Sequence, residues 1–472
     1  MIDFLTSLDS IVWGPAMICL LLGSHIFLTF RTHFIQRKLP LAIKMSMSDE
    51  SGAEGDITHF GALSTALAAT IGTGSIVGVA TAILAGGPGA VFWMWVAGIF
   101  GIATKYAEVY VAVKYRVKDH NGEILGGAMY AWERGFRTNE RTPRAAHVMA
   151  VLFALFAALA AIGTGSAVQA SAMTGTITAN FDVSPQIIGV AIVVLSGVVI
   201  LGGVQSISNV CEKLVPIMAL CYCAGCAIIM VVNAPYLGPA LYEIVVCAFT
   251  PRAAFGGAVG SGILAALQFG CARGLFSNEA GLGSAPIIAA AAQTKNPARQ
   301  SLVAMTGAFW STVVVCLLTG IVVVSTMLAN PDIAASIAAN PDTYSGAMLA
   351  AAVFAKIPYI GTPILVLGMV SFSYSTILGW SYYGSRCVAY LFGKRGVLPY
   401  QIVYVAVAFL GAIGVGDTVW LVSDIGNALM AIPNIIVVLA LSGIVARETK
   451  HYVYDGNLDE AYDADIPVIA SK

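Results

Sequence analysis

The sequence predicts an all-α polytopic membrane protein with about eleven transmembrane helices. The chain has 472 residues, of which 58% are apolar and only 10% are charged, whereas soluble domains carry about 25% charged residues. The apolar residues gather in long runs, and the Lys and Arg residues are concentrated in alternate loops. The formal net charge of −1 gives no indication of a nucleic-acid partner.

A membrane-spanning helix needs about 20 mostly apolar residues. Several of the runs exceed about 25 residues, which predicts tilting, kinking or a break, and the last run contains Pro433. The eleven candidate spans are 11–30, 61–85, 90–113, 146–176, 185–203, 211–232, 259–292, 302–327, 358–392, 397–413 and 416–446.

The connecting segments predict the orientation. One set of alternate loops holds 20 of the 24 Lys and Arg residues, and the opposite set holds only Arg252 and Lys356. Positive loops stay on the cytoplasmic side, so we expect an outside amino terminus and a cytoplasmic carboxyl terminus in the plasma (bacterial inner) membrane. We expect segment 328–357 to lie outside and to be partly helical, and the acidic tail beyond Arg447 to be unpacked. The basic loops are 31–60, 114–145, 204–213, 293–301, 386–396 and 447–472.

The segment 61–89 is long enough to cross a bilayer, yet glycines interrupt its centre. Glycine costs about 1 kcal/mol relative to alanine inside a helix, so Gly72, Gly74 and Gly78 predict a broken helix. Broken backbone at membrane depth is tolerated where it is buried in protein or lines a cavity. The segment is therefore a candidate substrate and ion site; the alternative is a small-residue face for helix packing.

A second interrupted segment, 259–292, carries Gly270, Gly274, Gly281 and Gly283. Paired interrupted helices at matching positions of two halves are typical of a transporter's central site. Five spans per half predict an inverted repeat, because after an odd number of spans the second half enters the membrane from the side opposite to the first. The expected divisions are an extra amino-terminal helix and loop in 1–60, repeats in 61–235 and 236–446, and a cytoplasmic tail in 447–472.

At these residues the chain resembles the alanine/glycine:cation symporter family, whose members are sodium-coupled carriers of small amino acids. The resemblance covers nearly all of the chain after the first span, and it implies the five-plus-five inverted-repeat fold. The stretches that carry it are IGTGSIVGVATAILAGGPGAVFWMW (71–95), GGVQSISNVCEKLVPIMALCY (202–222), GCARGLFSNEAGLGSAPIIAAAA (270–292) and STILGWSYYG (375–384).

The chain departs from the family pattern at small polar positions. Gly74-Ser75 stands where the family usually has Gly-Asn, and Gly165-Ser166 and Ala170-Ser171-Ala172 stand where it often has Gly-Asn and Ala-Asn-Ser. A serine hydroxyl is shorter and a weaker dipole than an asparagine carboxamide. We expect these changes to alter a cation contact or the substrate pocket.

The resemblance also implies a sodium site. Sodium prefers oxygen ligands, as hard cations do. The implied ligands are the backbone carbonyls near Ala68 and Ile71 with the hydroxyls of Ser375 and Thr376. Without the resemblance, the sequence favours hydroxyls that bond back to carbonyls of their own helix; the resemblance reverses this preference. Sodium is the only metal expected, and no cofactor is.

The implied substrate site lies around the same break. The amino acid's carboxylate is expected at the amides of Thr73, Gly74 and Ser75, where a half-helix amino terminus supplies positive potential. Its ammonium is expected at carbonyls between Gln268 and Gly270. The further candidates are Trp380 as a wall and Gln169, although tryptophan in a long span is also a common interfacial anchor.

Four ionisable groups lie within spans, where such groups are functional candidates. Arg273 and Glu279 fit a structural ion pair or a gate as well as a substrate contact. Lys105 and Glu108, three residues apart, fit a simple mutual pair. Asp424 and Asn427 have no partner that the sequence identifies.

The predicted function is sodium-coupled import of a small neutral amino acid, alanine or glycine, by alternating access. The alternatives are a proton-coupled carrier, or one specific for serine or glutamine, on the same fold. A channel or sensor is a third possibility, but the chain shows no charged ring for a pore. It is not predicted to be an enzyme, since its glycines match no nucleotide-binding motif. The expected partners are the amino acid, sodium and the lipid bilayer, with a monomeric functional unit.

Overall fold

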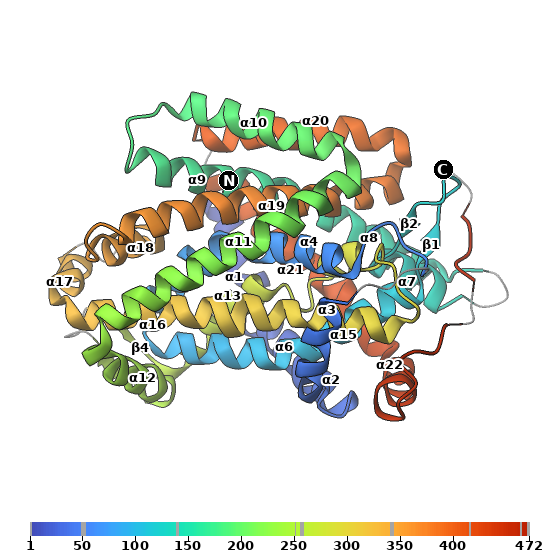
Figure 1. Ribbon diagram of the computed structural model, residues 1–472, viewed down its shortest axis with the longest axis horizontal. Helices are drawn as coiled ribbons and strands as arrows, with labels where there is room; N and C mark the ends of the chain where they lie inside the picture. Colours follow the sequence, from blue (N-terminus) through green and yellow to red (C-terminus); the bar gives the residue numbers. More distant parts are fainter. Residues whose placement is uncertain are drawn as a thin grey trace.

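The computed structural model describes residues 2–48, 53–137, 141–250, 252–254, 259–339, 344–414, 417–462 and 465–469. This part of the chain is almost entirely helical, and its long helices lie side by side along the longest axis of the molecule (Figure 1). The predicted all-α architecture is confirmed.

Among its described residues, the first half of the chain contains three α-helices that precede the first interrupted segment, and two helices that are interrupted by non-helical or π-helical residues. Its elements are α1 (Ile2–Val12), α2 (Pro15–Arg31), η1 (Ile35–Lys38), α3 (Leu39–Ser46), α4 (His59–Thr70), η2 (Thr73–Ser75), α5 (Val77–Gly86), α6 (Gly89–Lys114), β1 (Val117–Lys118), β2 (Ile124–Leu125), α7 (Ala128–Gly135), α8 (Arg144–Ala160), η3 (Ala161–Ala167), α9 (Val168–Thr178), α10 (Pro185–Leu201) and α11 (Gly203–Val232).

The second half has the same mixture of long and interrupted helices. Its elements are α12 (Ala234–Phe249), β3 (Arg252–Ala254), β4 (Val259–Ser261), α13 (Ile263–Asn278), α14 (Ala285–Ala289), α15 (Pro297–Ala308), η5 (Phe309–Cys316), α16 (Leu317–Ala329), α17 (Pro331–Ala339), α18 (Gly346–Ala355), α19 (Gly361–Phe392), η6 (Lys394–Gly396), α20 (Val397–Ala412), α21 (Asp417–Ala440), α22 (Ser442–Thr449) and η7 (Lys450–Tyr454).

Among the described residues, seven helices are long and apolar enough to cross a membrane, or eight if the bent pair Pro15–Arg31 and Ile35–Ser46 counts as one span. Their outward sides are apolar: Val198 on α10, Leu220 on α11 and Ile402 on α20 are 71%, 70% and 61% exposed. Such surfaces are stable against lipid tails and costly in water. The chain is therefore a multi-pass membrane protein.

Each of the eleven predicted runs contains helix, but the connection after the sixth run was predicted wrongly. Residues 234–249 form α12, a short apolar helix with Pro235 in its first turn and Pro239 inside it. Proline suits the first turn because that turn has no partner for the missing amide. In segment 328–357 the predicted helix is present as α18, preceded by α17.

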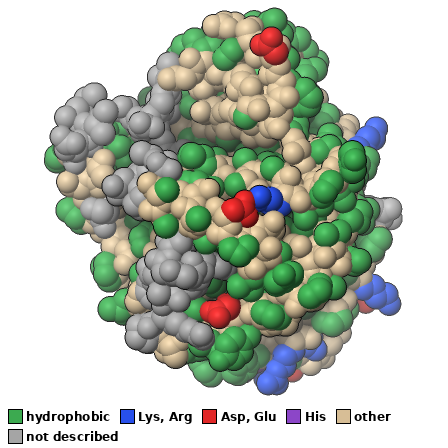
Figure 2. All heavy atoms as spheres, turned by 90° about the vertical axis from the view of Figure 1, so that its left-hand side faces the viewer, with side chains coloured by type: hydrophobic (Ala, Val, Ile, Leu, Met, Phe, Trp, Pro, Cys, Tyr) green, Lys and Arg blue, Asp and Glu red, His purple; other side chains and the backbone are tan. Residues whose placement is uncertain are grey.

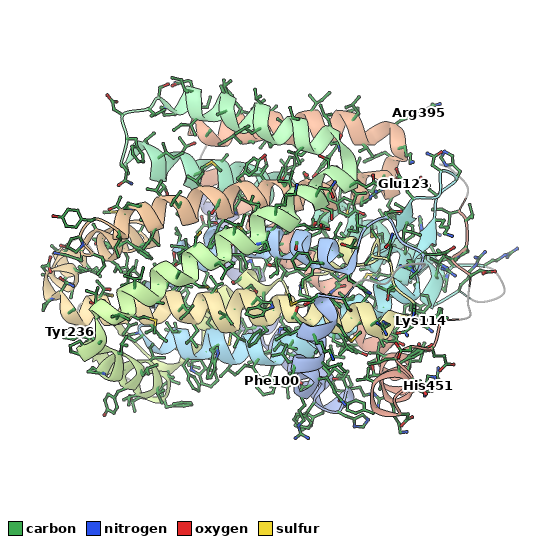
Figure 3. The ribbon with its side chains drawn as sticks, viewed as in Figure 1. Phe100, Lys114, Glu123, Tyr236, Arg395 and His451 are labelled. Atoms are coloured by element: carbon green, nitrogen blue, oxygen red, sulfur yellow. The ribbon has the colours of Figure 1, made fainter. Side chains whose placement is uncertain are left out.

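The two ends of the molecule differ in charge. At one end, near α7, β1 and β2, lie the labelled side chains of Lys114, Glu123, Arg395 and His451, whereas Tyr236 lies at the other end (Figure 3). Seen from that other end, the surface is mainly hydrophobic and uncharged, with few Lys, Arg, Asp or Glu side chains (Figure 2). We refer to these as the charged end and the apolar end.

The expectation that the tail beyond Arg447 is unpacked is wrong for its described residues. The tail continues as helix to Tyr454 and then crosses the charged end, where Asn296 Nδ2 donates to the carbonyls of Leu458 and Glu460 at 2.8 Å. Residues 467–469 then lie as an added strand beside β1: the Lys118 amide donates to Pro467, and the Ile469 amide donates to Lys118, both at 2.9 Å. Backbone pairing thus holds a segment whose polar composition predicted no packing.

Candidate functional site

Two helices are interrupted at the centre of the molecule, as the glycine clusters predict. The first interruption follows α4: Ile71 and Gly72 leave helical geometry, a single 3₁₀ turn forms at Thr73–Ser75, and α5 begins at Val77. The second follows α13, where Glu279 (φ +53°), Gly281 (φ +89°) and Gly283 (φ +80°) are left-handed before α14 begins. Gly281 and Gly283 adopt such angles without strain, whereas Glu279 does so against the preference of a residue with a Cβ.

The second interruption lies further along the chain than predicted. Gly270 and Gly274 are within α13 and allow it to pack closely on α6: a Cβ on Gly270 would lie 2.3 Å from the Ala90 carbonyl oxygen. The carbonyls of Gln268 to Gly270 therefore belong to a continuous helix. The unwound backbone is that of residues 279–284.

A small cavity, the central cavity, lies between the two interruptions. The cavity has a volume of about 10 Å³, which is about the room that one water molecule needs. Polar side chains and unwound backbone form one part of its wall, and aromatic and aliphatic groups form the rest. Its lining residues are Ala69, Thr70, Gly72, Gly74, Thr164, Gln169, Phe276, Glu279, Leu282, Thr376, Trp380 and Asn427.

The structure brings together three of the four residues expected around sodium. Ser375 Oγ and Thr376 Oγ1 on α19 lie 3.2 and 3.0 Å from the carbonyl oxygen of Ala68 on α4. Both hydroxyls also contact the Phe372 carbonyl oxygen, at 2.9 Å, as the back-bonding alternative predicts. The fourth residue, Ile71, is buried at the end of α4, three residues beyond Ala68.

Gly72 connects this oxygen cluster to the central cavity. A Cβ on Gly72 would lie 2.6 Å from Thr376 Oγ1 and 3.3 Å from Gln169 Oε1. Only glycine lets the hydroxyl and the carboxamide approach the backbone this closely. The hydroxyl of Thr376 thus lies on the wall of the cavity as well as beside Ala68.

Of the residues expected around the substrate, Gly74, Gln169 and Trp380 line the central cavity. Thr73 is next to it, with its amide donating to Gln169 Oε1 over a long 3.4 Å. Ser75 is buried in the same turn but does not line the cavity. Gly270 packs on α6, and Gln268 lines a separate cavity, so the structure does not bring these two to the central site.

That separate cavity, which we call the outer cavity, also holds Arg273. It is lined by Asp9, Trp13 and Asp424 as well, and Phe276 separates it from the central cavity because that side chain lines both. The Trp13 indole donates to the Asp424 carbonyl at 3.1 Å. Arg273 therefore faces the carboxylates of α1 and α21, and not Glu279.

Glu279 belongs to a buried charged group at the second interruption. Lys105 Nζ and Glu108 Oε1 are 3.3 Å apart, which confirms the expected pair. Glu108 Oε2 accepts hydrogen bonds from the Gly281 amide and from Asn434 Nδ2, both at 3.0 Å. These contacts fix the unwound backbone, and the Ser284 hydroxyl donates to Glu279 at 2.5 Å.

The comparisons with known proteins agree on one family. The sodium:alanine symporter family profile matches residues 1–463. The chain belongs to the sodium:alanine symporter family. It is 46% identical over 455 residues to the sodium/alanine symporter AgcS of Methanococcus maripaludis, which covers 96% of this chain and 97% of that protein. It is 32% identical over 447 residues to the probable sodium/glutamine symporter GlnT of Bacillus subtilis, which covers 94% and 89%.

The fold of this sodium:alanine symporter family member is shared with a solved transporter. The crystal structure of MhsT in complex with L-phenylalanine has a TM-score of 0.55 to this chain and covers 85% of it, and 95% of MhsT, at 14% sequence identity. At that identity the likeness concerns the fold alone. The resemblance read from the sequence motifs is thus confirmed at the level of the family.

Several cavity residues of this family member were not predicted. Asn427 Nδ2 on α21 donates to Thr164 Oγ1 at 2.6 Å, and Thr164 Oγ1 lies 2.5 Å from Ser423 Oγ. Asn427 Oδ1 is buried and has no hydrogen-bond partner among the described residues. An asparagine in an apolar span was the available signal, but its partner is 263 positions away in the sequence.

Phe276 and Leu282 line the cavity as well. They were missed because apolar side chains within an apolar run give no signal that separates a pocket wall from general packing.

Ser166, one of the serines that depart from the family pattern, was expected to alter a cation contact or the substrate pocket, but it lies elsewhere. Ser166, in the π-helical segment η3, donates to the Tyr404 carbonyl at 2.7 Å and does not line the cavity. Its neighbour Gly165 lets Trp380 approach, since a Cβ there would lie 2.2 Å from Trp380 Cβ. This part of the chain therefore sets the position of Trp380.

Proposed function

We propose that this protein is a sodium-coupled symporter that imports a small neutral amino acid, alanine or glycine, by alternating access. The observation that carries the proposal is the small, enclosed central cavity between two interrupted helices, with the Ala68, Ser375 and Thr376 oxygens beside it. Unwound backbone at membrane depth is tolerated where it is buried or lines a cavity, and paired interrupted helices typically form the substrate and ion sites of transporters.

The amino acid's carboxylate would bind at the first interruption. The amides of Ser75 and Ile76 already donate to the carbonyls of Gly72 and Thr73. The Thr73 amide makes only a long hydrogen bond to Gln169 Oε1, which a bound carboxylate could replace. Among the hydrogen bonds of the described residues, none uses the Gly74 amide. An anion here gains both these donors and the positive potential of the α5 amino terminus.

The ammonium group would bind on the opposite wall. Asn427 Oδ1 is a buried acceptor without a partner among the described residues, and such an acceptor costs about 1–3 kcal/mol until it is satisfied. The Glu279 carboxylate lines the same cavity. Phe276, Leu282 and Trp380 leave little room beyond these polar groups, which favours alanine and glycine over glutamine.

The sodium ion would be held by the Ala68 and Ile71 carbonyls with the Ser375 and Thr376 hydroxyls. These are hard oxygen ligands contributed by α4 and α19. The substrate and the ion would then share the unwound backbone at residues 71–72, so that each would stabilise the geometry that the other needs.

The proposal includes eleven membrane crossings. They comprise the eight helices identified by length together with α4–α5, α10 and α13–α14, each of which is too short or too interrupted for that test. We further propose that residues 61–235 and 236–446 form inverted repeats. The charged end and the carboxyl terminus would face the cytoplasm, and the amino terminus would lie outside. One chain would be the functional unit.

Uptake of radiolabelled alanine into proteoliposomes tests the function. We expect an inward sodium gradient to drive accumulation above equilibrium, and unlabelled alanine or glycine to compete. Accumulation at the same rate with choline in place of sodium would contradict sodium coupling. Competition by glutamine but not by glycine would contradict the proposed pocket, and would place the chain beside the relative named as a glutamine symporter.

A further inference from the structure

A third, much larger cavity lies at the charged end, and it shares no lining residue with the central cavity. It has a volume of about 1040 Å³, the size range of sites for drug-sized ligands. The β1–β2 hairpin, α7, the turn between α19 and α20, and the tail segment 467–469 surround it. We call it the tail cavity.

The carboxylates of the tail cavity are already paired. Burial raises the pKa of Glu133, but hydrogen bonds from Tyr390, His147 and Thr142 lower it below its ordinary value, so this carboxylate is ionised at neutral pH. The other carboxylates have cationic partners: Asp119 with Lys394 at 2.7 Å and Glu123 with Arg386 at 2.9 Å.

Three arginines of the same cavity have no carboxylate partner among the described residues. Arg137 and Arg395 are exposed and make no side-chain hydrogen bond or ion pair there. Arg134 donates only to backbone carbonyls, at 2.8 Å to Arg116. Burial and the nearby Arg137 guanidinium lower the pKa of Arg134. The cationic side chains that line the tail cavity therefore outnumber its carboxylates.

The remaining wall is aromatic and apolar. The rings of Tyr130 and Tyr390 are 5.5 Å apart and nearly perpendicular. Val468 and Ile469 of the tail lie on the other side, where the strand beside β1 holds them. A single inorganic ion would leave most of this cavity unfilled, so its shape suits a larger molecule with an anionic part and an apolar or planar part.

We propose that the tail cavity is a binding site for a phosphate-bearing small molecule. Arg137, Arg395 and Arg134 hold the phosphate, since guanidinium groups match its oxygens in charge and geometry. The tyrosine pair and the tail cover the rest of the ligand. A soluble nucleotide and a phospholipid headgroup both carry such a phosphate. Phe392, which also lines the cavity, is 70% exposed.

The test is binding to the full-length protein in detergent. ATP, inorganic phosphate and short-chain phosphatidylglycerol micelles are titrated separately, at constant ionic strength, while thermal stability and affinity are measured. The test variant is Arg137→Gln with Arg395→Gln, because neither side chain has a structural partner. The matched control is Arg141→Gln with Arg144→Gln, which removes the same charge at the same end without touching the cavity lining. A chain ending at residue 465 removes the tail wall.

We expect ATP or phosphatidylglycerol to stabilise the wild type, and the affinity to fall about tenfold or more in the test variant and in the shortened chain, but not in the control. Which of the two ligands stabilises the protein identifies the source of the phosphate. Stabilisation by neither, or an equal loss in the control variant, would overturn the proposal. The assay needs no transport, so its failure is distinct from failure of the proposed function.

Discussion

At the scale of single residues, the contact between Ala68 and the Ser375–Thr376 pair is the feature with the sharpest consequence. Replacing both hydroxyl residues by alanine removes two oxygens, each worth about 0.5–1.5 kcal/mol as a hydrogen-bonding group. We therefore expect the sodium concentration for half-maximal uptake to rise about tenfold or more. Ser381→Ala is the control, because among the described residues this buried hydroxyl on the same helix donates to the Leu378 carbonyl alone. An unchanged sodium dependence would refute the sodium site.

The sequence could place some residues next to one another, but not others. Ser375 and Thr376 could be placed near Ala68 because the resemblance specified the pair, and the structure has them in contact. Asn427 could not be placed, because its partner Thr164 comes from another helix. The substrate and sodium roles themselves stay predictions.

At the scale of elements, the π-helical segment η3 determines how close Trp380 lies to the central cavity. Gly165→Ala would put a Cβ 2.2 Å from Trp380 Cβ, and because that atom is fixed to the backbone, η3 and α19 would have to move apart and shift Trp380. We expect this variant to fold and reach the membrane but to lose most alanine uptake. Gly175→Ala, on the adjoining helix with nothing within 4 Å of the new Cβ, should retain uptake. Normal uptake by Gly165→Ala would show that the position of Trp380 is not critical.

The two interrupted helices show what glycine clusters can and cannot predict. Both interruptions were expected from composition, and both are present. The position of the second was wrong because glycine serves two purposes in the same segment: Gly270 allows close packing on α6, and Gly281 and Gly283 adopt left-handed angles. Sequence spacing alone does not separate a packing glycine from a hinge glycine.

At the scale of the whole molecule, the asymmetry between the charged end and the apolar end predicts orientation. Tyr359, which is 98% exposed, follows α18. We expect Tyr359→Cys to react with a membrane-impermeant maleimide in intact cells, and Arg395→Cys to react only after the membrane is opened. The wild type, with its own nine cysteines, gives the background. The reverse pattern would invert the proposed topology.

The membrane class and the family could be predicted from the sequence because composition and long motifs specify them. The packed tail could not, because backbone pairing between residues 467–469 and β1 leaves no trace in side-chain polarity. The tail segment forms part of the wall of the tail cavity, so the cavity could not be predicted from the sequence.

The central claim is that sodium and the amino acid share one unwound segment at residues 71–72. The most direct test is the affinity of purified protein for alanine, measured by equilibrium binding in sodium and in choline at the same ionic strength. The account predicts that sodium strengthens alanine binding, and, by linkage, that alanine strengthens sodium binding by the same factor. Equal alanine affinity in sodium and in choline would contradict it.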